Sequence, residues 1–245
     1  MSIKLNCDMG ESFGLYKIGL DEEIMPYINM ANLACGFHAG DSVTMNKSVQ
    51  LAKKNNVEIG AHPGYQDLVG FGRRSIACTQ EEIISMLVYQ VGALEAFCKM
   101  YDTKVTYVKP HGALYQDMMK DDAVFMAIVK AISSYNTNLK LMILSSPRNH
   151  EYAKMAKEYN IELLFEVFAD RNYNDNGSLV SRALDNAIIK DEADVISRIK
   201  SLKEKGTLLS ISGKELSLQT DVLCVHGDTN NALEFIQILR KEISA

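Results

Sequence analysis

The 245-residue sequence has no tryptophan, only four prolines and only five cysteines. An odd number of cysteines with no CxxC pair argues against a disulfide framework and against a zinc ribbon. Cys7, Cys35 and Cys224 fall inside predicted strands, where cysteine acts as a small buried hydrophobe. Unpaired, buried cysteines are typical of a reducing compartment, so we expect a cytoplasmic protein.

Several functional signatures are also missing. The chain lacks GxxxxGK[ST], GxGxxG after a strand, and GxSxG, so we expect no P-loop for ATP, no Rossmann dinucleotide site and no nucleophile elbow. The net charge of −5 and the absence of a dense basic patch argue against nucleic acid. The N-terminus turns polar within six residues, and no apolar run approaches a membrane span, so neither a signal peptide nor a membrane anchor is predicted.

What the sequence does contain is a regular alternation of short apolar runs and helical patterns. This alternation predicts parallel strands joined by right-handed crossovers, in an α/β fold of one (β/α) domain spanning residues 1–245. A closed barrel and an open doubly wound sheet both fit the pattern. The seven predicted strands cover residues 3–7, 29–35, 57–61, 105–108, 139–144, 161–167 and 221–225, and a β-hairpin is predicted over 207–219.

The helices are predicted between these strands, over residues 21–27, 43–56, 79–101, 121–134, 150–159, 191–205 and 231–243. Thr79 followed by Glu82 predicts a capping box. We interpret Asp21 and Ser42 as helix caps only.

Polar side chains recur where the apolar runs end, commonly beside glycine, and four of the five histidines occupy such positions. In a parallel barrel all strands point the same way, so residues far apart in sequence meet at the carboxyl-terminal face. The side chains predicted to converge are Asp8, Glu11, His38, His62, Lys109, His111, Asp170, Arg171, His226 and Asp228.

Histidines with carboxylates allow two kinds of chemistry. One is a divalent metal site that activates water, for which Asp8, His38 and His62 are candidate ligands. The other is metal-free general acid–base hydrolysis. Spacing does not separate them, since ligands from different strands leave no local signature. Arg73, in a glycine-containing loop, is a candidate for binding an anion.

Six segments, read together, resemble the LamB/YcsF family of 5-oxoprolinase A subunits. They are LNCDMGESFG, ANLACGFHAGD, IGAHPGYQDLVGFGRR, VKPHGALY, EVFADRNY with GSLVSR, and CVHGDT, and they span nearly the whole chain. The resemblance implies a distorted TIM-like barrel of about seven strands, akin to the glycoside hydrolase/deacetylase group. It also implies hydrolysis of 5-oxo-L-proline to L-glutamate, coupled to ATP hydrolysis and carried out with subunits B and C.

On this basis we expect the partner subunits to supply ATP activation and this chain to open the ring. Asp8 or Glu11 would orient water, and His111 or His226 would act as acid or base. Lys109, with Arg73 or Arg171, would steady the negative charge of the substrate. The wider catalytic set includes His38, His62 and Asp228, and the wider substrate-binding set includes Tyr115 and Asp170.

Two rival functions stay open. The first is a stand-alone, metal-dependent carbohydrate deacetylase or amidase on a similar barrel. The second is a non-catalytic subunit that binds the lactam and delivers it.

Overall fold

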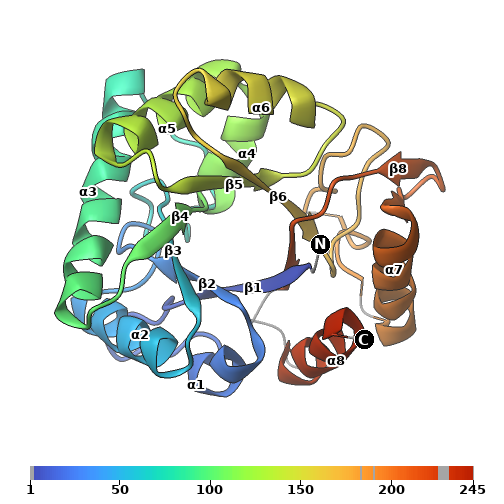
Figure 1. Cartoon of the computed structure of the whole chain (residues 1–245), viewed down its shortest axis with the longest axis horizontal. Coiled ribbons are helices and arrows are strands. Elements are labelled where there is room, and N and C mark those ends of the chain that lie inside the picture. The colour runs from blue at the N-terminus through green and yellow to red at the C-terminus, as the bar shows by residue number, and fades with distance from the viewer. Residues whose placement is uncertain (1–2, 183, 190, 226–231, 245) are drawn as a thin grey trace.

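The computed structural model describes residues 3–182, 184–189, 191–225 and 232–244. Seven parallel strands close into a barrel in the order β1-β2-β3-β4-β5-β6-β9, with helices around its outside (Figure 1). The closed barrel, and not the open sheet, is therefore confirmed. The strands are β1 (Lys4–Met9), β2 (Met30–Ala34), β3 (Glu58–His62), β4 (Val105–Val108), β5 (Lys140–Leu144), β6 (Leu163–Phe168) and β9 (Val222–Val225).

All seven predicted strands are present, with ends that differ by at most two residues from the predicted ones. The first strand β1 pairs with the last, β9, through Lys4 opposite Val222 and Cys7 opposite Val225. The helical elements are α1 (Asp21–Ile24), the 3₁₀ helix η1 (Met25–Tyr27), α2 (Ser42–Lys54), α3 (Gln80–Met100), α4 (Gly112–Lys120), α5 (Asp122–Tyr135), α6 (Asn149–Lys157), α7 (Glu192–Lys205) and α8 (Ala232–Ser244).

Helix caps show where local prediction succeeds and where it fails. The Thr79–Glu82 capping box is present at the start of α3. Ser42 is not a cap, because Asp41 precedes it and accepts hydrogen bonds from the backbone of Val43 and Thr44. An aspartate carboxylate satisfies two free backbone N–H groups at once, which explains why Asp41 occupies the cap.

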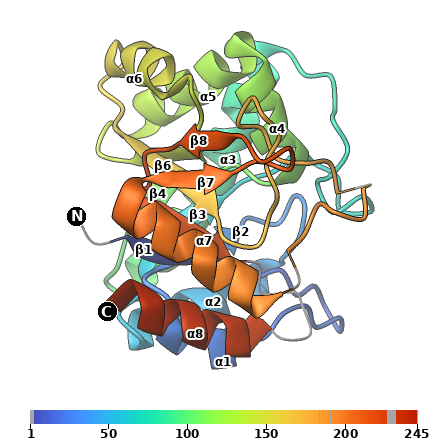
Figure 2. The ribbon, with the colours of Figure 1, turned by 90° about the vertical axis from the view of Figure 1, so that its right-hand side faces the viewer.

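The predicted hairpin lies outside the barrel. Strands β7 (Thr207–Leu209) and β8 (Glu215–Ser217) pair antiparallel, and Figure 2 shows them packed beside α7, which in turn lies along α8. The connection from β6 to β9 thus contains both α7 and this hairpin, and the barrel itself has seven strands among the described residues.

The part of the barrel interior away from the carboxyl-terminal face is apolar. Met30, Tyr107, Met142 and Val222 form a cluster of their own there, separate from the core between the sheet and the helices. Gly60 is required beside it, because a Cβ at this position would lie 2.1 Å from the Tyr107 ring. The Tyr107 ring thus fills the apolar part of the barrel interior. The polar part of the interior begins at its hydroxyl.

Helix α3 is long and apolar enough to cross a membrane by length and composition, a possibility that the sequence did not suggest. In the structure it is one of the barrel helices. It packs most extensively against α5, and Ile83, Leu87, Val91 and Leu94 are buried in the core. Its apolar character is explained by this packing.

Candidate active site

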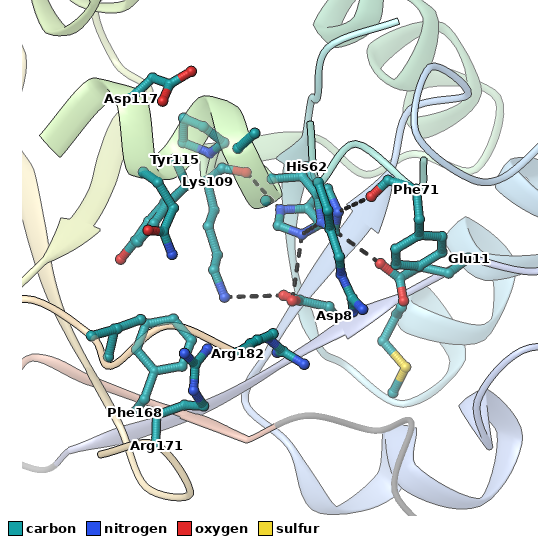
Figure 3. Close-up of a pocket in the computed structure, with 18 of the residues that line it drawn as sticks. Asp8, Glu11, His62, Phe71, Lys109, Tyr115, Asp117, Phe168, Arg171 and Arg182 are labelled. Atoms are coloured by element: carbon teal, nitrogen blue, oxygen red, sulfur yellow. Dashed lines mark hydrogen bonds and ion pairs between the residues drawn. The ribbon is translucent and has the colours of Figure 1, made fainter. Parts of the chain in front are cut away.

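A cavity of about 500 Å³ opens at the carboxyl-terminal face of the barrel. Its size is ordinary for a small-molecule site. Figure 3 shows its wall, to which loops after β1, β3, β4 and β6 contribute. Of the predicted site residues, the cavity is lined by Asp8, Glu11, His62, Arg73, Lys109, His111, Tyr115 and Arg171.

Lys109 is the centre of one half of the site. Its ammonium group lies 3.0 Å from Asp8 and 2.8 Å from Glu166, and its side chain is only 3% exposed. Burial by itself lowers the pKa of Lys109, but the charges of Asp8 and Glu166 raise it well above the usual value. The lysine is therefore held as a cation between two carboxylates.

A chain of hydrogen bonds saturates the groups around Lys109. The Asn32 amide donates to Asp8 Oδ1 at 2.7 Å, and the Asn6 amide donates to Glu166 Oε1 at 2.9 Å. Tyr115 donates its hydroxyl to Glu166 Oε2 at 2.8 Å. Tyr115 therefore holds Glu166 in addition to lining the cavity, and the substrate contact predicted for it stays a prediction.

The other half of the site is a histidine cluster made of His38, His62 and His111. His62 Nδ1 lies 2.6 Å from the Lys109 carbonyl, and His111 Nε2 lies 2.9 Å from the Phe71 carbonyl. A carbonyl oxygen only accepts, so each of these nitrogens carries the proton. The remaining nitrogens, His62 Nε2 and His111 Nδ1, face each other at 3.0 Å.

The loop after β3 sets this geometry. Phe71 adopts a left-handed φ of 53°, an unusual conformation for a bulky residue, and so aims its carbonyl at His111. Gly72 follows with φ of 61°, where a Cβ would lie 2.6 Å from the Cβ of His38. Only glycine fits, because the loop passes directly over the stacked imidazoles.

His38 is fully buried and does not line the cavity. Its ring stacks on His111 with centroids 3.7 Å apart and planes 4° apart. Within the described part of the chain, neither of its ring nitrogens has a hydrogen-bond partner. Burial, followed by the neighbouring His62, holds the pKa of His38 well below its usual value, so the ring is neutral at physiological pH.

Carboxylates border the histidine cluster. Glu11 Oε1 lies 3.6 Å from His38 Nε2 and 3.9 Å from His111 Nδ1. Glu11, His38, His62 and His111 each offer one ligand atom within 4.8 Å of the others, which makes them candidate metal ligands. Asp8 approaches from the Lys109 side, with Oδ2 at 3.5 Å from His62 Nε2.

The two predicted arginines, Arg73 and Arg171, make different contacts. Arg73 lines the cavity and stacks over the Phe71 ring at 5.0 Å. Arg171 also lines it, but its guanidinium donates to the carbonyls of Ala187 and Val180, so it holds the loop after β6 in place. Burial lowers the pKa of Arg171 to about 10. Asp170, beside it, is buried and does not line the cavity.

Comparison with known proteins identifies the family of the chain and agrees with the fold. The model of the LamB/YcsF family matches residues 3–245. The chain belongs to the LamB/YcsF family. It is 49% identical to the 5-oxoprolinase A subunit of Vibrio campbellii, over 98% of this chain and 95% of that one. It is 47% identical to the 5-oxoprolinase A subunit of Pyrococcus abyssi, over 98% and 93% of the two chains.

A solved structure gives the same result for the fold. The lactam utilization protein of Thermus thermophilus superposes with a TM-score of 0.91 at 37% identity, covering 100% of this chain and 96% of that one. The expected TIM-like barrel of the LamB/YcsF family is thereby confirmed.

The predicted site residues His226 and Asp228 lie outside the described residues. The sequence reasoning missed several residues of the site. Glu166 and Asn32 are polar positions inside otherwise apolar strands, a signal that they face the barrel interior. Arg182, within the GSLVSR segment, lines the cavity and was not predicted as a site residue.

Asp21 was interpreted as a helix cap, and that interpretation is wrong. It is the first residue of α1, lines the cavity and accepts a hydrogen bond from the Gly10 backbone at 2.8 Å. Burial raises the pKa of Asp21 to about 6, with a contribution from the charge of Glu11, although the Gly10 hydrogen bond opposes it. Nothing in its local sequence distinguishes it from an ordinary N-terminal helix aspartate.

Proposed function

We propose that this chain is the A subunit of an ATP-dependent 5-oxoprolinase, a hydrolase that opens the lactam ring of 5-oxo-L-proline to give L-glutamate. The relatives named as A subunits of 5-oxoprolinase support the reaction, and their near-complete coverage of the chain supports carrying it over. The observation on this chain that carries the proposal is Asp8. It stands at the cavity, fixed by Lys109 and Asn32 and facing the histidine cluster.

The need for ATP follows from the chemistry of the substrate. A five-membered lactam is a stable amide, and its carbonyl carbon is a poor electrophile until the carbonyl oxygen is activated. The chain carries no P-loop motif, so we assign phosphorylation of that oxygen to partner subunits B and C. The word "subunit" in the names of the relatives supports a multi-chain enzyme. We place the assembly in the cytoplasm, where ATP is available.

Asp8 is the general base in this scheme. Its Oδ1 accepts hydrogen bonds from Asn32 and Lys109, both of which favour the ionised carboxylate. Its Oδ2 faces His62, and the residue lines the cavity. Asp8 takes a proton from water as the water oxygen bonds to the activated carbonyl carbon. It returns that proton to the ring nitrogen as the C–N bond breaks, which leaves the phosphate on the new side-chain carboxyl group. A second water then hydrolyses this acyl phosphate and releases inorganic phosphate and L-glutamate.

The cations that line the cavity explain the choice of an anionic substrate. The 5-oxoproline carboxylate and an activating phosphate both carry negative charge, and Arg73 and Arg182 line the same cavity. Arg171 is occupied with backbone carbonyls, so we assign charge neutralisation to Arg73 and Arg182, and the support of Asp8 to Lys109.

The test is reconstitution with the two partner subunits, ATP and 5-oxoproline, with glutamate release as the readout. Asp8→Asn keeps the shape of the side chain but removes the base, so we expect kcat to fall by about 100- to 10,000-fold. Glu162→Gln, on an exposed carboxylate paired with Lys140 outside the barrel, is the matched control and should be unaffected.

A role in lactam delivery alone makes the opposite prediction. In that case Asp8→Asn would raise KM and preserve kcat. Fast glutamate release by the isolated chain would contradict the assignment of ATP activation to the partners.

A further inference from the structure

The two facing nitrogens of His62 and His111 cannot both be unprotonated acceptors unless a cation lies between them. The carbonyls of Lys109 and Phe71 fix the protons on the opposite side of each ring, so a lone pair points inward from His62 Nε2 and from His111 Nδ1. These lone pairs face each other at 3.0 Å in a buried site. Two acceptors at that distance repel, and a cation between them removes the repulsion.

The ring orientations show that a single cation can satisfy both nitrogens. The planes of His62 and His111 are perpendicular, at 90°, so one point can lie in both planes. Ligands about 2.0–2.1 Å from a tetrahedral metal lie about 3.3 Å from one another. The His62–His111 distance of 3.0 Å and the Glu11–His111 distance of 3.9 Å bracket that spacing.

The ring geometry excludes His38 as a ligand alongside His111. A metal lies near the plane of the imidazole that binds it, and the two rings are parallel at 3.7 Å. No point within bonding distance can lie in both planes. His38 therefore stacks on His111 and lies 3.6 Å from Glu11 without sharing an ion with His111, and its nitrogens lack hydrogen-bond partners among the described residues.

We propose that Glu11, His62 and His111 bind one divalent transition-metal ion of the zinc or cobalt class. Two imidazoles and one carboxylate form a donor set suited to these ions, and it leaves coordination positions open toward the cavity. The backbone carbonyls of Lys109 and Phe71 orient the two imidazoles, as outer partners do in known metal sites. Asp8 Oδ2, 3.5 Å from His62 Nε2, lies where it can contact a water on the ion.

The experiment measures metal binding directly and does not require catalysis. The full-length protein is stripped with a chelator and titrated with Co²⁺ or Zn²⁺. Bound metal is counted by elemental analysis, and the visible absorption of Co²⁺ reports nitrogen and oxygen ligation. We expect one equivalent of Co²⁺ or Zn²⁺ per chain, and no comparable binding of Mg²⁺, which prefers oxygen ligands.

The stacked pair supplies a matched control. His111→Leu should weaken Co²⁺ binding by more than about 100-fold, which exceeds the 10- to 100-fold cost typical of losing an outer partner. His38→Leu, the same substitution in the ring stacked on it, should leave the affinity within a few-fold. Glu11→Gln is the second ligand variant and covers the case in which His111→Leu does not fold, as judged by circular dichroism.

The inference is overturned if the stripped wild-type chain binds neither Co²⁺ nor Zn²⁺ stoichiometrically. In that case a proton is the cation between the rings, and nitrogen NMR would show one charged imidazole. It is also overturned if His38→Leu loses as much affinity as His111→Leu. Metal binding without lactam hydrolysis would leave it standing and would count only against the proposed function.

Discussion

The two halves of the cavity differ in how completely their polar atoms are hydrogen-bonded. Around Lys109, nearly every polar atom has a partner: Asn32, Asn6 and Tyr115 hold the two carboxylates that flank the ammonium group. In the histidine cluster a few ångströms away, His62 and His111 point lone pairs at each other, and both His38 nitrogens lack hydrogen-bond partners within the described chain. Both halves are buried, so solvent does not explain the difference.

A buried polar group without a partner costs stability, whereas a saturated network holds its members in one arrangement. The saturated half therefore fixes the position of Asp8 before any ligand arrives. The unsaturated half keeps binding capacity for something that the chain itself does not provide. The following predictions test this contrast, from the largest effect on stability to the smallest.

Lys109→Met should destabilise the protein most. It would leave the buried carboxylates of Glu166 and Asp8 without their shared cation, which costs about 3–5 kcal/mol when one partner of a buried ion pair is removed. Urea unfolding of both proteins measures the change. Lys140→Met, on the exposed pair with Glu162, is the control and should change stability by less than about 1 kcal/mol. Equal losses in the two variants would show that the Lys109 network is not a special feature of the site.

Tyr115→Phe removes one donor from the same network and little volume. Glu166 Oε2 would lose its hydrogen bond from the tyrosine hydroxyl, and we expect a loss of about 1–3 kcal/mol. Thermal unfolding gives the value. A substitution without effect would mean that water replaces the hydroxyl and that this half is less closed than its contacts indicate.

Asp21, a cavity carboxylate whose pKa is raised in part by the charge of Glu11, gives a pH-dependent test. Its pKa of about 6 is above the ordinary value of 3.8, so the folded protein binds more protons than the unfolded chain between these values. The contribution of Asp21 to stability is present below pH 4 and is lost as the pH rises through 6. Because the group is partly exposed, we expect Asp21→Asn to stabilise the protein at pH 7 by about 1–2 kcal/mol.

The pH profile is the control for that prediction. The advantage of Asp21→Asn should shrink below pH 6 and disappear near pH 4, as followed by urea unfolding at each pH. An advantage that stays constant with pH would attribute the effect to packing and would remove Asp21 from the titrating groups.

His38→Leu should have the smallest effect, despite complete burial of the residue. The substitution removes two nitrogens that have no hydrogen-bond partner among the described residues and keeps a similar volume. We expect stability to change by less than about 1 kcal/mol, or to rise. A loss as large as that of Lys109→Met would show that His38 is satisfied in solution, and the contrast between the two halves would fail.

Much of the fold could be predicted from short stretches of the sequence. All seven barrel strands and the hairpin are visible as apolar runs with turn residues at their ends, and Thr79 with Glu82 marks the start of α3. The failures were also local in origin. Asp41 and Ser42 are adjacent capping residues, and only the backbone conformation decides between them. Asp21 looks like any acidic residue at a helix start, and its contact with Gly10 depends on how the loop after β1 folds.

By itself, the sequence determined that the chain forms parallel strands with polar carboxyl ends, because hydrophobic periodicity and turn chemistry act over a few residues. It also identified Asp8, Glu11, His62, Lys109 and His111 as residues that meet at one face, and all of them line the cavity. Closure of the barrel decided the rest. It brought Glu166 on β6 within 2.8 Å of Lys109 at the end of β4, and it placed His38 behind His111 and out of the cavity. Which polar group is satisfied and which is left for a ligand depends on contacts between distant strands, and no short stretch of sequence encodes such contacts.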